Sequence, residues 1–453
     1  MNYLLPIFAV LAAAFFRTAD ASPHENIYAA YVLLGNDGQS IARVITDAPA
    51  CPDVRFDGKT EKMQLRASPA DVPARPGSLK NAKFPVLVCD ARLPAHVWHV
   101  SIAGRALPVP VKNPQRIVVI GDTGCRMNQS EHAFQSCTDP EKWAFRQISA
   151  AAAAFKPDLV IHVGDYLYRE SPCPKGASGC AGSPWGYGFD SWQADFFDPA
   201  KRLLAAAPWV MVRGNHESCA RAGQGWFRFL DTQPFAPSRS CDNPEDDPEG
   251  DFSEPYSVPI AGDTQLIVFD SSKAANSAYS PEDAAYQTYL SQFRKVDELA
   301  GRMPHSFFLS HHPVLAYAPD EEKEDGPAHP GNRGLQSVMQ AIHPLRLFSP
   351  GIDAAFHGHV HLFEALDFAD DHPATVVTGN SGTATDNPLP ETLPEGEQPA
   401  PGAMVNRIVS DSEVGFLTIE RIGKQWLITE RNRLGKPQVR CTLRGRSLLC
   451  ARL

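Results

Sequence analysis

The stretch RIVVIGDTG, residues 116–124, is a continuous apolar run that stops at Gly121 and Asp122. A continuous apolar run, rather than an alternating one, is typical of a strand that is buried on both faces of its sheet. Later segments with the same texture alternate with helical patterns, and this alternation predicts an α/β core. These segments are DLVIHVGD (158–165), WVMVRGNHE (209–217), QLIVFDSS (265–272), HSFFLSHHP (305–313), DAAFHGHVH (353–361) and ATVVTGNSG (374–382).

Two of the intervening helices carry recognisable start signals. Pro140 is expected to open the first, which buries Phe145 and Ile148 on one face. Ser280 is expected to cap the second, with Pro281 at its first position. The apolar residues of the second helix recur at helical spacing, and they are Tyr286, Tyr289, Leu290, Phe293, Val296 and Leu299.

Polar side chains gather where the apolar runs end. In an open α/β sheet the carboxyl ends of the strands meet at one edge, so these side chains are expected to come together. Carboxylates can bridge two cations, imidazoles complete each coordination shell, and an amide oxygen adds a neutral ligand. The pattern therefore suits a two-metal site for phosphoryl displacement by water. The residues concerned are Asp122, Asp165, Tyr166, Tyr168, Asn215, His216, Glu217, His311, His312, His359 and His361.

Five motifs within residues 121–361 resemble those of the calcineurin-like metallophosphoesterase superfamily. They are GD-x-G, GD-xx-Y, GNHE, a His that ends an apolar strand, and GH-x-H, and they occur in the family order. The Gly two residues after Asp122 and the Tyr three residues after Asp165 make the resemblance closest to the purple acid phosphatases. The resemblance implies an α/β fold, a four-layer α-β-β-α sandwich preceded here by a small all-β domain.

Carried over position by position, the resemblance implies the ligands of two metal ions. One metal would be held by Asp122, Asp165, Tyr168 and His361. The other would be held by Asp165, Asn215, His311 and His359, with Asp165 as the bridge. His216 would lie beside the metals and contact the phosphoryl group or the leaving oxygen. The ions implied are Fe(III) and a divalent ion, which is iron, zinc or manganese.

Other residues near the motifs have simpler interpretations. His357 and His162 are expected to be hydrogen-bonded core histidines, and His312 is expected to lie just outside the ligand set. Tyr166 is next to Asp165, but the family spacing selects Tyr168 as the ligand.

The resemblance predicts hydrolysis of small phosphate monoesters. Metal-bound hydroxide would attack phosphorus, and an acid such as His216 would protonate the leaving alkoxide. A trivalent and a divalent ion, set against two carboxylates, a phenolate and a bridging hydroxide, leave the centre with about one positive charge, which suits a phosphate dianion. One alternative is a phosphodiesterase or nucleotidase with two divalent ions. A non-catalytic binding protein on the same fold is disfavoured, because all seven ligand positions are filled.

The amino terminus predicts an exported protein. Residues 4–16 form a short apolar run, and Ala19-Asp20-Ala21 matches a small-x-small cleavage site. The run is shorter than the roughly 20 residues of a membrane span, so no stable membrane insertion is expected. In an exported protein the ten cysteines favour disulfides between neighbours. The expected pairs are Cys51/Cys89, Cys125/Cys137, Cys173/Cys180, Cys219/Cys241 and Cys441/Cys450.

The sequence patterns and the family resemblance together divide the chain into four segments. We predict a signal peptide at 1–21, a β-domain at 22–112, a catalytic domain at 113–430 and a tail at 431–453 that packs on it. The β-domain contains short alternating runs without catalytic residues, and a module for binding a partner or a surface glycan is one interpretation of it. Two acidic or Pro-rich segments, 242–254 and 379–402, are expected to be solvated loops. A net charge of −10 argues against nucleic acid as a partner, and no feature indicates the oligomeric state.

Overall fold

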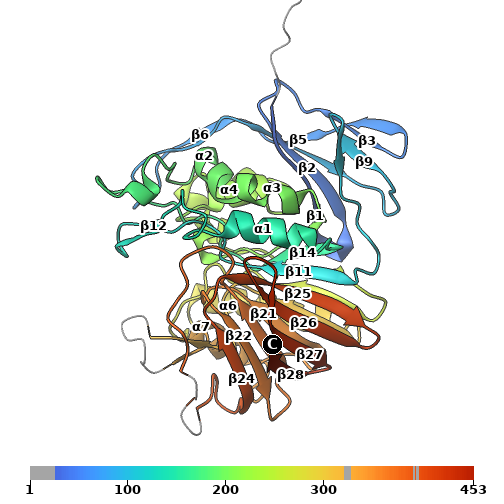
Figure 1. Ribbon diagram of the computed structural model, residues 1–453, viewed down its shortest axis with the longest axis vertical. Coiled ribbons are helices and arrows are strands. Elements are labelled where there is room, and N and C mark those ends of the chain that lie inside the picture. Colours follow the sequence, from blue (N-terminus) through green and yellow to red (C-terminus); the bar gives the residue numbers. More distant parts are fainter. Residues whose placement is uncertain (1–25, 321–327, 391–392, 394–396) are drawn as a thin grey trace, which may run out of the picture.

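Two large sheets form the centre of the computed structural model, which describes residues 26–320, 328–390, 393 and 397–453 (Figure 1). The first has eleven strands, in the order β28 (Ser447–Arg452), β27 (Pro437–Arg444), β26 (Gln425–Asn432), β25 (Gly415–Ile422), β11 (Arg116–Ile120), β14 (Leu159–His162), β15 (Trp209–Met211), β1 (Ile27–Leu34), β2 (Ser40–Thr46), β8 (Leu87–Arg92) and β5 (Gln64–Ala67). The second has seven, in the order β16 (Tyr256–Pro259), β17 (Thr264–Val268), β18 (His305–Leu309), β21 (Ile352–His357), β23 (Ala374–Thr378), β22 (Phe363–Phe368) and β24 (Val405–Asp411). The predicted signal peptide lies outside the described residues.

The sheets pack face to face and helices cover their outer faces, which confirms the predicted four-layer sandwich. Ile117 and Val119 of β11 lie in the apolar core between the sheets, whereas Val118 and Ile120 lie in the core under the helices of the first sheet. Figure 1 shows the helices of the first sheet gathered on one side of it. They are α1 (Phe145–Ala154), α2 (Phe189–Trp192), α3 (Asp198–Leu204) and α4 (Gly223–Phe229). The second sheet is covered by α6 (Ala284–Ala300) and α7 (Arg333–Met339).

Every apolar segment predicted as a strand forms one. In the first sheet β11, β14 and β15 are parallel neighbours, and in the second sheet β17, β18, β21 and β23 are parallel neighbours. Both groups are buried on two faces, which explains why their sequences are apolar without alternation. Their carboxyl ends supply the polar residues discussed below.

Both predicted helix starts are wrong by a few residues. The first helix begins at Phe145, because residues 139–143 form turns in which the Trp143 N–H donates to Asp139 O at 2.8 Å. The second begins at Ala284, because Asp283 has an extended backbone and its Oδ2 accepts the Ser280 N–H at 2.8 Å. Within the described ranges, no helix is long and apolar enough to cross a membrane.

The region before β11 is all-β, as predicted, but it shares a sheet with the rest of the chain. It contains a separate sheet in the order β10 (Arg105–Leu107), β9 (Val100–Ile102), β3 (Asp53–Phe56) and β4 (Lys59–Lys62), and a ribbon of β6 (Ala70–Val72) and β7 (Ala82–Phe84). Leu33 of β1 pairs in parallel with Trp209 of β15. Through this pair, β1, β2, β8 and β5 extend the sheet that carries the candidate site.

The five expected disulfides are all present. They join Cys51 to Cys89, Cys125 to Cys137, Cys173 to Cys180, Cys219 to Cys241 and Cys441 to Cys450, and no cysteine is free.

The two segments expected to be solvated loops are only partly so. Segment 242–254 contains α5 (Asp247–Gly250), and Asp251 is buried, where its Oδ1 accepts the Cys219 N–H at 2.9 Å. Segment 379–402 has no helix or strand among its described residues. One of its residues, Asp386, reaches the candidate site.

Candidate metal centre

The polar side chains identified in the sequence lie where strands of both sheets end. Asp122 follows β11, Asp165 follows β14, and His359 follows β21. All three have positive φ, at 56°, 59° and 73°. This left-handed conformation costs a non-glycine residue about 1 kcal/mol or more and is concentrated at functional sites. The tight turns bring candidate ligands from both sheets to one point.

Two glycines allow the strand ends to approach each other. A Cβ atom at Gly214 would overlap Asp165 Oδ1, and a Cβ atom at Gly358 would overlap Asp122 Oδ2. The glycines of the GNHE and GH-x-H motifs are therefore required by the close packing of the carboxylates.

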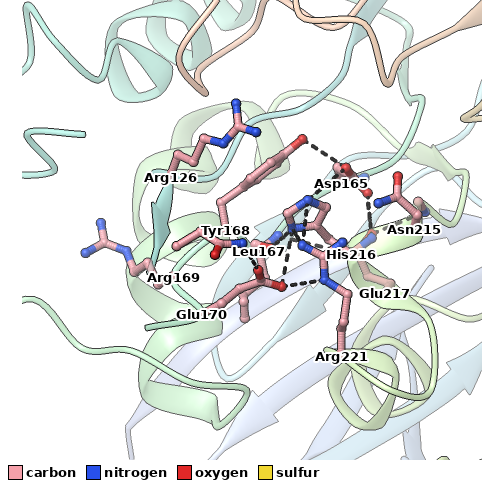
Figure 2. Close-up of polar contacts among 12 residues, drawn as sticks. Arg126, Asp165, Leu167, Tyr168, Arg169, Glu170, Asn215, His216, Glu217 and Arg221 are labelled. Carbon is pink, nitrogen blue, oxygen red and sulfur yellow. Dashed lines mark hydrogen bonds and ion pairs between the residues drawn. The ribbon is translucent and has the colours of Figure 1, made fainter. Parts of the chain in front are cut away.

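The Tyr168 hydroxyl occupies one half of the site. Its oxygen lies 2.8 Å from Asp122 Oδ1, 2.9 Å from Asp165 Oδ2 and 3.0 Å from His361 Nε2. Figure 2 shows the hydroxyl directed at Asp165. A phenol has only one proton to donate, yet two carboxylate oxygens lie within hydrogen-bond distance of it. A bound cation would interact favourably with the phenol oxygen and with both carboxylate oxygens, so this half of the site fits a metal ion.

Asn215 and two histidines form the other half. His311 Nε2 lies 2.9 Å from Asn215 Oδ1 and 3.2 Å from Asp165 Oδ2, and His359 Nδ1 lies 3.1 Å from Asn215 Oδ1. Asp165 therefore takes part in both halves. Ligand atoms of Asp122, Asp165 and His311 all lie within 4.8 Å of one another, a spacing that could hold a metal ion. The seven predicted ligands thus come together, and carboxylate, imidazole, phenol and amide donors suit hard or borderline cations.

Three groups of this cluster lie among carboxylates and have raised pKa values. Burial lowers the pKa of His311, but Asp165 and Asp122 outweigh it and raise that pKa to about 9. Burial is similarly outweighed at His361, where Asp386 and Asp122 raise the pKa to about 10. Burial and the same two carboxylates, Asp122 and Asp165, raise the pKa of Tyr168 well above its usual range. All three groups therefore carry their protons at neutral pH.

Metal binding at neutral pH is expected to release protons from His311, His361 and Tyr168, because a ligand atom must lose its proton to bind the ion. Since the pKa values are raised, affinity should increase as the pH rises through the pKa of His311, about 9, and that of His361, about 10. Calorimetric titration of the metal-free protein with Zn²⁺, in buffers of different ionisation enthalpy, gives the number of protons released. His311→Gln should release about one proton fewer. Identical heats in all buffers would contradict this expectation.

His216 lies at the edge of the cluster. Its backbone N–H donates to Asp165 Oδ1 at 2.9 Å, and its Nδ1 lies 3.1 Å from Leu167 O. A carbonyl only accepts, so Nδ1 carries a proton, and Nε2 lies 3.7 Å from Asp165 Oδ2 and 2.8 Å from Arg221 Nη2. Burial and the Arg221 cation lower the pKa of His216 well below its usual range. The ring is therefore neutral before an anion binds.

Two buried carboxylates hold the backbone of the site in place. Glu217 accepts the N–H groups of Asp165, Tyr166, Leu167 and Gly214 at 2.9–3.2 Å. Asp195 accepts the Tyr168 N–H at 2.8 Å and the Cys125 N–H at 3.1 Å. Glu217 belongs to the GNHE motif, so the sequence pointed to it. Asp195 lies in a helical segment with no motif, and no local pattern marked it.

Two further charged residues near the site were missed. Asp386 accepts the backbone N–H of His361 at 2.8 Å and lies 3.3 Å from His361 Nδ1, a position from which a carboxylate can support a metal-binding histidine. Arg221 lies against His216. The first is in a Pro-rich loop and the second in the turn before α4, where composition alone indicates solvent exposure.

The residues with simpler interpretations lie as expected. His357 is buried, with Nδ1 3.0 Å from Ser310 Oγ, and His162 is buried and stacked on Tyr166. The Tyr166 hydroxyl donates to Val212 O at 2.9 Å, away from the carboxylates. The His312 ring lies 4.2 Å from the His359 ring, and its Nδ1 is 3.2 Å from Ser271 Oγ.

Comparison with known proteins agrees with this geometry. The family model for calcineurin-like phosphoesterases matches residues 115–363, which include all five motifs. No curated protein sequence matches the chain. The structure of purple acid phosphatase PPD1 from yellow lupin (Lupinus luteus) seeds is 14% identical, with a TM-score of 0.57, over 94% of this chain and 74% of that one. A structure of PhoD is 12% identical, with a TM-score of 0.55, over 94% of this chain and 91% of that one. At these identities the likeness to the two solved structures shows the fold alone. Because the family model covers more than half of the sequence, the chain belongs to the calcineurin-like phosphoesterases, a superfamily of metal-dependent enzymes.

Proposed function

We propose that the protein is an exported phosphatase of the purple acid phosphatase type, which hydrolyses small phosphate monoesters with two metal ions. The observation that carries this proposal is the position of Tyr168, whose hydroxyl lies 2.8 Å and 2.9 Å from two buried carboxylates. A phenolate beside two carboxylates is a hard, strongly anionic donor set, which favours a trivalent ion such as Fe(III). Residues 113–430 would form the catalytic domain.

The residues would divide between two ions as the motifs predict. Fe(III) would be held by Asp122, Asp165, Tyr168 and His361, and a divalent iron, zinc or manganese ion by Asp165, Asn215, His311 and His359. When bound, the two ions would supply an activated water and stabilise the negative charge of the phosphoryl group. Asp386 would fix the orientation of His361, and Glu217 would fix the backbone that presents Asp165.

His216 would act beside the phosphoryl group. Its Nδ1–H is held by Leu167 O, so Nε2 is the atom free to exchange a proton. A bound phosphate dianion raises the pKa of a neighbouring imidazole, so His216 would take up a proton on Nε2 when the substrate binds. It would then give that proton to the leaving alkoxide, as a general acid.

Space for the organic part of the ester lies next to His359. A cavity of about 440 Å³ opens there, lined by His359 and Val360 of the site and by polar residues that include Asn276, Tyr317 and Arg333. Its size suits a small substrate, and its lining suits a polar leaving group.

A phosphodiesterase or nucleotidase with two divalent ions is the second candidate. The six predicted ligands other than Tyr168 are sufficient for that chemistry. A non-catalytic role is disfavoured, because a scaffold that has lost its activity would have no need of seven converging ligands.

Export is supported by the cysteines. All ten are paired in disulfides, which persist in oxidising compartments and are rare in the cytosol.

Metal analysis combined with ester hydrolysis tests the proposed function. The purified protein is expected to contain two metal ions per chain, one of them iron, and to hydrolyse p-nitrophenyl phosphate faster than bis(p-nitrophenyl) phosphate. Activity should peak on the acid side of neutral, because a trivalent ion lowers the pKa of bound water further than a divalent one. Iron-free protein with an alkaline optimum and a preference for the diester would favour the second candidate. Inactivity towards both esters with both metals bound would reject either enzyme.

A further inference from the structure

Arg221 lies across the face of the His216 ring, at the rim of the metal centre. Its Nη2 atom is 2.8 Å from both His216 Nδ1 and His216 Nε2. In an imidazole, Nδ1 and Nε2 are both bonded to the carbon Cε1. An atom that lies 2.8 Å from both nitrogens is therefore over the ring rather than in line with the lone pair of either nitrogen. The Tyr168 ring packs against His216 with centroids 3.9 Å apart. The imidazole is thus held between the phenol and the guanidinium (Figure 2).

The guanidinium is held in place from behind by Glu170. Arg221 Nε donates to Glu170 Oε1 at 2.5 Å. The Glu170 side chain is only 8% exposed, and it accepts hydrogen bonds from Asn128 Nδ2 at 3.0 Å and from the Tyr187 hydroxyl at 3.3 Å. Glu170 therefore fixes Nε, and Nη2, the neighbouring nitrogen of the guanidinium, lies against His216 at the rim of the metal centre. The Arg221 side chain is 24% exposed, so an anion entering from solvent can reach it.

We propose that Arg221 binds the phosphoryl group of the substrate and gives the site its preference for monoester dianions over diester monoanions. This proposal rests on the proposed function and names the charge state that the site selects. A guanidinium is always charged and presents several N–H donors in a plane, a geometry that matches phosphate oxygens. Nη2 already lies beside His216 Nε2, the atom proposed to face the leaving oxygen. A small movement over the ring would let it donate to a non-bridging phosphoryl oxygen.

The charge of Arg221 matters more for a monoester than for a diester. A monoester dianion keeps three non-bridging oxygens and two negative charges, whereas a diester has two such oxygens and one charge. In a site that excludes water, a preorganised cation stabilises the more highly charged group more strongly. A residue that served only to hold His216 in place would instead affect both substrates equally.

Arg221→Gln, compared with wild type and Arg221→Lys, tests the proposal. Removal of one preorganised donor to a developing oxyanion typically costs about 100-fold. We therefore expect kcat/KM for p-nitrophenyl phosphate to fall about 100-fold in Arg221→Gln, and that for bis(p-nitrophenyl) phosphate to fall less than about tenfold. Arg221→Lys keeps the charge and should recover part of the monoester activity. The matched control is Arg302→Gln, which removes an exposed cation that pairs with Asp37 away from the site.

Binding of inorganic phosphate to the metal-loaded proteins, measured by calorimetry, separates this proposal from the proposed function. Weaker phosphate binding by Arg221→Gln, with unchanged metal content and melting temperature, supports the anion-binding role even if no ester is turned over. Equal losses for both esters, with phosphate affinity unchanged, would overturn the role of Arg221 and leave the phosphatase assignment in place. If Arg221→Gln fails to fold, Arg221→Lys alone decides, because a purely structural arginine would give the same monoester-to-diester ratio as wild type.

Discussion

Asn215→Ala is expected to lower kcat by about three orders of magnitude or more, with one metal ion lost and the fold retained. The amide oxygen lies 2.9 Å from His311 Nε2 and 3.1 Å from His359 Nδ1, so its removal takes away the group on which both histidines converge. Asn215 is half-buried and belongs to none of the four apolar clusters of the described residues, so the substitution should leave the packed cores intact. Elemental analysis, kcat and the melting temperature measured on one preparation check the three parts of this expectation.

His311→Ala is the companion variant and should give the same loss of metal and activity. His305→Ala is the matched control, since His305 lies at the opposite end of the same strand, β18, where it is exposed and pairs with Asp353 at 2.6 Å. The control should retain both metals and normal turnover. Near-normal activity of Asn215→Ala or His311→Ala with both ions bound would remove these residues from the metal centre.

Tyr168→Phe is expected to abolish the colour of the protein. Charge transfer from a phenolate to Fe(III) should make the wild-type protein violet, and the substitution removes the phenolate oxygen that would supply it. The substitution keeps the aromatic ring, so the packing is retained. It removes only the buried hydroxyl that lies against two carboxylates, which is the predicted ligand atom. A visible spectrum before and after substitution, on protein of known iron content, gives the result directly.

Tyr166→Phe is the control for this spectrum. Its hydroxyl donates to Val212 O, so the variant should keep the violet colour. A colourless wild-type protein that contains only divalent metal would reject the iron–tyrosinate interpretation. The esterase with two divalent ions would then stand, because the other six ligands do not depend on Tyr168.

The candidate ligands could be predicted from sequence because each one ends an apolar strand in a short motif. The residues that support them could not. Asp386 comes from a Pro-rich loop and meets His361 only after folding, and Asp195 binds the Tyr168 backbone from a helical segment without a motif. Such contacts depend on tertiary packing, for which a single sequence contains no local pattern.

In the fold, too, local patterns predicted some features, whereas features that depend on tertiary packing were missed. Seven apolar runs predicted seven strands, because burial on both faces leaves a direct trace in composition. The helix starts were missed by a few residues, because Asp283 competes with Ser280 as the cap and a tight turn delays the helix at Phe145. The parallel pairing of β1 with β15 was also missed. The sequence around β1 has the pattern of the predicted β-domain, whereas β15 lies in the predicted catalytic domain, and neither pattern indicates that the two strands pair.

That pairing has a consequence for the order in which the chain acquires its structure. The first described strand lies beside a strand that is synthesised much later, and the Leu33–Trp209 contact spans a long stretch of sequence. Contacts of this kind slow folding, because a large loop must close before they form. All five disulfides, in contrast, close segments of 7 to 38 residues and can form within their own neighbourhoods. The covalent links can therefore form early without fixing a wrong arrangement, while the edge of β15 stays unpaired and prone to aggregation until β1 docks against it.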